Sequence, residues 1–100
     1  MFSGGDYHEV RRWLWNFLTS HAKREHARAE VVLDDAGARE GTSYGARIRL
    51  GDRETPVIEF EYADVARHRG ELAWCRALAE RIREVVRDLA AATPTGARAR

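Results

Sequence analysis

Several residue types are scarce in this chain of 100 residues, and each scarcity removes a class of protein. A single cysteine, Cys75, rules out an internal disulfide and a metal site built from several thiolates. No apolar run approaches the roughly 18 residues that a membrane span needs. Residues 1–5 lack the basic and then apolar order of a secretory signal. We therefore expect a soluble cytoplasmic protein without membrane contacts.

Lysine and glutamine are also scarce, since sixteen of the seventeen basic residues are arginine and glutamine is absent. The chain has sixteen alanines. Arginine and alanine have GC-rich codons, so a GC-rich genome explains this bias without a nucleic-acid partner. The formal net charge is only +1, and residues 27–63 carry five arginines against eight acidic residues. Composition alone therefore indicates no basic excess of the kind that phosphate neutralisation requires.

Three runs of alternating apolar and polar residues lie between two amphipathic helical patterns. The alternation predicts strands over residues 28–34, 43–50 and 55–62. Apolar residues at helical spacing predict helices over residues 6–24 and 71–92, the first opened by a capping box of Asp6 and Glu9.

This order predicts an α+β fold: a two-layer α/β sandwich with the order α-β-β-β-α, in which a three-stranded antiparallel meander carries both helices on one face. We expect residues 1–93 to form a single domain and residues 94–100 to form a disordered basic tail.

Strand pairing must keep the apolar side chains on one face of the sheet. The inward set is Ala29, Val31, Leu33, Tyr44, Ala46, Ile48, Leu50, Ile58, Phe60 and Tyr62. For the second hairpin, a two-residue loop would mix odd and even positions, which favours three or five residues around residues 51–55. A register that pairs Arg47 with both Glu30 and Glu59 would place a charge ladder on the outer face.

The last predicted helix is longer than the strands that it covers. Its 22 residues span about 33 Å, whereas an eight-residue strand spans about 26 Å. Its final turn, with Val86 and Leu89, is therefore expected to extend beyond the sheet and to meet a second copy of the chain. Trp15 lies outside the apolar stripe of the first helix, so it is either a rim residue over the sheet margin or an interface anchor.

Candidate catalytic and metal-binding residues do not combine into a site. Gly41-Thr42-Ser43-Tyr44-Gly45 matches the pattern of a nucleophile elbow but leads from a loop into a strand instead of into a helix. His21 and His26 are five residues apart and diverge on a helix, and Cys75 occupies a helical core position. We predict no catalytic, cofactor-binding or metal-binding residue, and hence no enzyme.

The order of one helix, three strands and one helix is similar to that of double-stranded RNA-binding domains and of dimeric YbaB-type nucleoid proteins. In the RNA-binding family, a lysine cluster at the start of the last helix contacts phosphate. The corresponding stretch here is Arg67-His68-Arg69-Gly70-Glu71, and the first hairpin loop lacks the family's Pro-His element. The resemblance implies a nucleic-acid-binding module. The residues that could contact nucleic acid in such a module are Arg11, Arg12, Arg67, His68, Arg69 and Arg76.

Two functions thus remain open. The leading hypothesis is a non-enzymatic, self-associating protein–protein interaction module, a homodimer without a cofactor. The alternative is the nucleic-acid-binding module, in which the turn at residues 67–69 either binds anions or is simply solvated.

Overall fold

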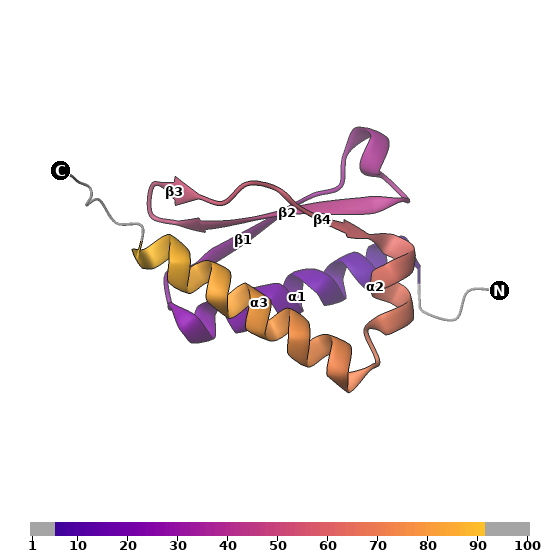
Figure 1. Ribbon diagram of the computed structural model, residues 1–100. Coiled ribbons are helices and arrows are strands. Elements are labelled where there is room, and N and C mark those ends of the chain that lie inside the picture. The colour runs from indigo at the N-terminus through magenta and orange to yellow at the C-terminus, as the bar shows by residue number, and fades with distance from the viewer. Residues whose placement is uncertain (1–5, 92–100) are drawn as a thin grey trace.

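The computed structural model describes residues 6–91, and Figure 1 shows their course. In chain order the elements are α1 (Tyr7–Glu25), β1 (Glu30–Asp34), a 3-10 helix η1 (Gly37–Arg39), β2 (Ser43–Leu50), β3 (Arg53–Glu54), β4 (Ile58–Glu61), α2 (Tyr62–His68) and α3 (Leu72–Ala91). The Asp6 carboxylate accepts a hydrogen bond from the backbone N–H of Glu9 at 2.8 Å and caps α1, as the sequence predicts.

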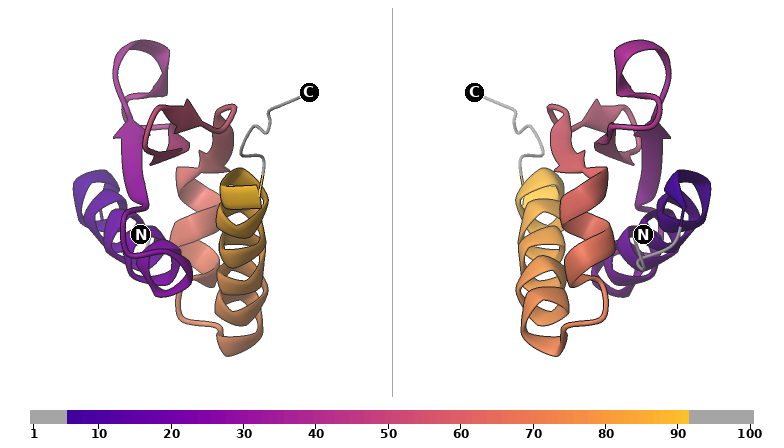
Figure 2. Two further views of the ribbon diagram at one scale, coloured as in Figure 1. Left: turned by 90° about the vertical axis from the view of Figure 1, so that its left-hand side faces the viewer. Right: turned by 90° about the vertical axis from the view of Figure 1, so that its right-hand side faces the viewer.

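The fold has two layers, and β2 is the central strand of its sheet. β1 pairs antiparallel with one side of β2, and β3 and β4 pair antiparallel with its other side. The long helices α1 and α3 lie beneath the same face of the sheet, and α2 is seen between them in both views (Figure 2). The predicted α+β class and helix placement are therefore confirmed. The third predicted strand is divided into β3 and β4, and the short helix α2 follows it directly.

The hairpin between β2 and β3 corrects the predicted loop length. Leu50 pairs with Arg53, so the loop contains two residues, Gly51 and Asp52. Gly51 has a φ of 66°, which the tight turns of two-residue hairpins require at their first central position. The prediction excluded this loop because it would mix the two faces.

An extra residue in the third strand restores the match between faces. Across β3 the paired residue numbers sum to 103, whereas across β4 they sum to 104, as in Ala46 with Ile58. One additional residue therefore lies between Thr55 and Val57, which is a β-bulge. Because of it, Phe60 is buried on the same face as Tyr44 and Ile48.

The predicted charge ladder is wrong by two residues. Arg47 lies opposite Val32, and Glu30 lies opposite Arg49. Arg47 and Arg49 instead approach the carboxylate of Glu54 in β3, at 3.7 and 3.8 Å.

One hydrophobic core lies between the helices and the sheet. α1 contributes Val10, Leu14 and Leu18 to it, and the sheet contributes the stacked ring of Tyr44, 4.7 Å from the ring of Tyr7. The predicted inward residues Ile58 and Tyr62 are half-buried, and the other predicted inward residues are buried: Ala29, Val31, Leu33, Tyr44, Ala46, Ile48, Leu50 and Phe60.

α1 also closes the free edge of β1. The indole N–H of Trp15 donates to the backbone carbonyl of Val31 at 2.9 Å, and Arg11 donates to that of Leu33 at 3.5 Å. These carbonyls point away from β2, so side chains one helical turn apart occupy the acceptors that a further strand would use.

None of the helices within residues 6–91 combines the length and apolar content that a bilayer crossing requires. The predicted basic tail, residues 94–100, lies outside the described residues.

Candidate interaction groove

Helix α3 carries charged residues on both sides of its buried stripe, and the two sides differ in their surroundings. Arg83 and Arg87 lie on one side, where both approach the carboxylate of Glu25 in α1, at 3.4 and 3.8 Å. Arg81 and Asp88 lie on the other side, which faces the β3–β4 edge of the sheet. Neither of these two forms an ion pair with another residue in the range 6–91.

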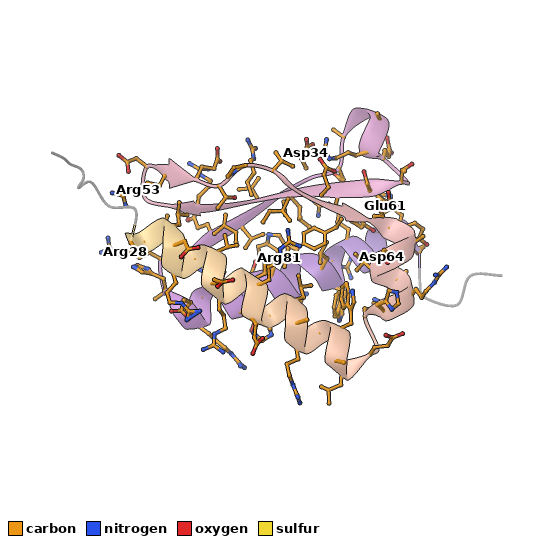
Figure 3. The ribbon with its side chains drawn as sticks, viewed as in Figure 1. Arg28, Asp34, Arg53, Glu61, Asp64 and Arg81 are labelled. Atoms are coloured by element: carbon orange, nitrogen blue, oxygen red, sulfur yellow. The ribbon has the colours of Figure 1, made fainter. Side chains whose placement is uncertain are left out.

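An apolar groove runs between α3 and this edge of the sheet. Its first section has a volume of about 400 Å³ and is lined by residues 54–58 of the sheet edge and by Arg81, Val85, Asp88 and Leu89 of α3. A second hollow of about 310 Å³ lies next to it, between β4 and the N-terminal half of α3, and Arg81 lines both. Figure 3 labels Arg81 between α3 and the sheet, with Glu61 and Asp64 near the far end of the second hollow.

The bulge forms the sheet wall of the first section. Thr55 hydrogen-bonds to both backbone groups of Ile48, through its own N–H and through its hydroxyl, each at 3.0 Å. Pro56 and Val57 follow outside the ladder, so Val57 projects with 47% of its surface exposed. Val57 is thus an exposed apolar residue at the rim of an apolar groove.

The structure separates the three predicted interface residues. Leu89 lines the groove and is half-buried. Val86 is 0% exposed and belongs to the hydrophobic core, so its prediction as an interface residue is wrong. The final turn of α3 packs on its own chain instead of extending free, because α3 crosses beside α1 and not only beneath the strands.

Trp15 is 40% exposed and bonds to Val31 at the β1 edge, which is the opposite edge of the sheet from the groove. Trp15 thus lies at the rim of the sheet, as the first alternative expects, and its role as an interface anchor stays a prediction. The sheet has one closed edge at β1 and one open edge at β4.

The predicted anion-contact residues are partly neutralised by acidic neighbours. Arg11 approaches Asp35 at 2.8 Å, and Arg69 approaches Glu9 at 3.9 Å. His68 lies between two carboxylates, those of Asp64 at 3.6 Å and Glu71 at 3.1 Å.

The remaining three of this set, Arg12, Arg67 and Arg76, are exposed and lie on three different helices. Nucleic-acid binding by these residues stays a prediction.

The residues considered for catalysis lie apart. Ser43 begins β2, and its carbonyl accepts the hydroxyl of Tyr7 at 2.7 Å. His21 packs on Phe17 with ring centroids 4.5 Å apart, and burial, followed by the charges of Arg24 and Arg83, lowers its pKa. Burial raises the pKa of the Cys75 thiol, with a further contribution from Glu71, and the thiol donates to the carbonyl of Arg69 at 3.3 Å.

Among residues 6–91, no three histidine, cysteine or acidic side chains are grouped as metal ligands would be.

Of the residues that line the first section of the groove, sequence reasoning named Leu89 as a site residue and missed the others, among them Val57, Arg81, Val85 and Asp88. Val57 carried a usable signal, because the strand pattern places this valine on the outer face, where apolar residues are unexpected. Arg81 and Asp88 gave no such signal in the sequence, because a surface helix normally carries many charged residues.

Comparison of this chain with protein-family models, with curated proteins and with solved structures finds no match.

Proposed function

We propose that this chain is a non-enzymatic interaction module that associates with a second copy of itself through the apolar groove between α3 and the β3–β4 edge. The observation that carries the proposal is the combination of a protruding apolar residue, Val57, with a receiving apolar surface, Val85 and Leu89, in one patch.

A patch that contains both a projection and a recess is self-complementary. In a two-fold dimer, each contact from the first copy to the second is repeated from the second to the first. Val57 of each copy would therefore fill the groove of the other beside Leu89. Burying such side chains supplies roughly 25 cal/mol for each Å² of apolar surface removed from water.

Pairing of the two open sheet edges is a less favourable arrangement. Ile48 directs its backbone groups toward Thr55, so by the alternation of the ladder Ile58 and Phe60 bond to β2. The backbone groups of Glu59 and Glu61 then face outward. Antiparallel pairing of this edge with its copy would set glutamates opposite glutamates, which is destabilising. The bulge and Pro56 shorten the usable edge further.

Replacement of Val57 by aspartate tests this surface. V57D would bury a carboxylate in each half of the interface, so we expect dimer dissociation to become at least about tenfold easier. The fold should persist because nearly half of the Val57 surface is exposed and the residue lies outside the hydrophobic core. Light-scattering mass over a range of protein concentrations measures the change.

Leu72→Asp is the matched control, because Leu72 is 71% exposed and lies at the start of α3, outside the lining of the groove. L72D should keep the wild-type mass. A wild-type chain that is monomeric at every concentration, or a V57D protein with an unchanged dimer, would overturn the proposal. Repeating the measurement with duplex nucleic acid at two salt concentrations tests the alternative function, whose binding should weaken steeply with salt.

A further inference from the structure

Arg81 and Asp88 are the charged residues of α3 that line the first section of the groove, and they are oppositely charged, exposed and without an ion-pair partner among residues 6–91. Val85, which also lines this section, lies between them in the sequence. Seven residues are about two turns of helix, so the two charges lie on nearly the same side of α3 and about 10 Å apart along its axis.

This spacing has a consequence when two α3 helices face each other in opposite directions. In an antiparallel pair, residue numbers that lie opposite one another have a constant sum. With the two-fold axis next to Val85, Arg81 of one copy lies opposite Asp88 of the other, and the same contact occurs a second time. A parallel arrangement would instead place like charges together.

We infer that the second copy docks with α3 antiparallel to α3 about a two-fold axis beside Val85, and that two Arg81–Asp88 ion pairs between the copies determine this register. The inference rests on the proposed self-association and adds the orientation of the copies and the residues that select the partner.

Arg76, Glu80 and Glu84 of α3 also have no ion-pair partner among residues 6–91, but none of the three lines the first section of the groove. Arg83 and Arg87 on the opposite side already have Glu25 as a partner within the chain. A copy approaching from that side would find its cations compensated. The groove side instead offers one charge of each sign that has no ion-pair partner among residues 6–91.

Charge reversal at these positions gives a test that does not depend on stability alone. R81E would place glutamate opposite aspartate twice in the dimer, and D88R would place arginine opposite arginine twice. Each variant by itself should dissociate at least about tenfold more easily than the wild type, a loss of about 1.4 kcal/mol. Sedimentation or light-scattering mass at matched concentrations gives the constants.

Mixing the two variants supplies the decisive measurement. In a heterodimer, the new glutamate of the R81E chain meets the new arginine of the D88R chain, which restores one ion pair with reversed sense. The second pair forms between the unchanged Asp88 of the R81E chain and the unchanged Arg81 of the D88R chain. We expect the mixture to form a one-to-one heterodimer with near wild-type affinity. The double variant R81E/D88R should likewise recover the homodimer.

Two charge changes on other parts of α3 serve as controls. Arg76→Glu and Glu80→Arg alter exposed residues that do not line the groove, and both should leave the dimer intact. Because Arg81 also lines the hollow that contains Glu61 and Asp64, thermal unfolding of R81E monitors its fold separately.

The outcomes separate this inference from the function on which it rests. If V57D disrupts the wild-type dimer but neither charge reversal weakens it, the proposed antiparallel register is wrong. The groove would still be the dimer interface. Reversals that weaken the dimer without recovery on mixing would also overturn the pairing. A monomeric wild type would overturn both proposals.

Discussion

Gly45 has no Cβ, and this leaves space on the outer face of the sheet for the side chain of Arg39. Asp34, Gly45 and Glu59 lie in one row across β1, β2 and β4. The Arg39 side chain reaches back from η1 across Gly45, close enough that an added Cβ would lie 2.7 Å from its Nε. There the guanidinium pairs with Glu59 and approaches Asp34 at 3.9 Å. Glycine is thus the only residue that leaves room for this arginine between two carboxylates.

A double-mutant cycle on this pair is our prediction at the residue scale. Gly45→Ala should displace the guanidinium, and Arg39→Ala should remove it, so each should lower the free energy of unfolding by roughly 0.5–1 kcal/mol, as for other partly exposed ion pairs. In the Arg39→Ala background, Gly45→Ala should be neutral or stabilising, because alanine is less costly than glycine inside a strand. Urea denaturation measures the coupling; additive effects would show that the two residues act independently.

At the scale of elements, the bulge between β3 and β4 has two effects. It restores the inward face of the sheet after a two-residue hairpin, and it places Val57 outside the ladder at the groove. Thr55 makes this interruption tolerable, since its hydroxyl accepts the N–H of buried Ile48 where a strand carbonyl would otherwise do so.

Substitution of Thr55 therefore tests the bulge. Thr55→Val keeps the shape but leaves the Ile48 N–H without its acceptor, so the free energy of unfolding should fall by roughly 1–3 kcal/mol. Thr55→Ser keeps the hydroxyl and should lose much less. Chemical denaturation measures the free energy of unfolding of both variants. An equal decrease in the two would show that the Thr55 hydroxyl does not stabilise the bulge.

At the scale of the whole molecule, one core connects α1, the sheet and α3, and Val86 lies within it. Val86, in α3, is 0% exposed. Val57, between β3 and β4, is 47% exposed. We therefore expect a monomer to tolerate a charge at Val57 but not at Val86, because only the buried position removes a carboxylate from water.

Val86→Asp should lower the free energy of unfolding by about 4 kcal/mol or more, which is a large share of the roughly 5–15 kcal/mol that stabilises a typical domain. V57D should cost little as a monomer. Circular dichroism during thermal unfolding distinguishes them. A well-folded V86D monomer would contradict the burial of this valine and return it to the interface.

The sequence by itself determined the two long helices, their order, the extent of β2 and the inward face of the strands. These depend on periodicity and capping, which act over a few residues: Asp6 caps α1, and Tyr44, Ala46 and Ile48 alternate into the core. The same local rules could not predict the bulge. A two-residue turn at Gly51 and Asp52 shifts the apolar residues to the wrong face, and the extra residue that restores the match lies several positions further along the chain.

Tertiary structure alone decided which surfaces remained open. Trp15 caps a carbonyl of β1 sixteen residues away, and Val86 is buried because α3 crosses α1. The groove exists because α3 packs beside α1 and leaves the β3–β4 edge uncovered, with Arg81 and Asp88 along it. Such features depend on the distance between elements remote in the chain, and that distance is set by how their side chains pack, not by the pattern within any one of them.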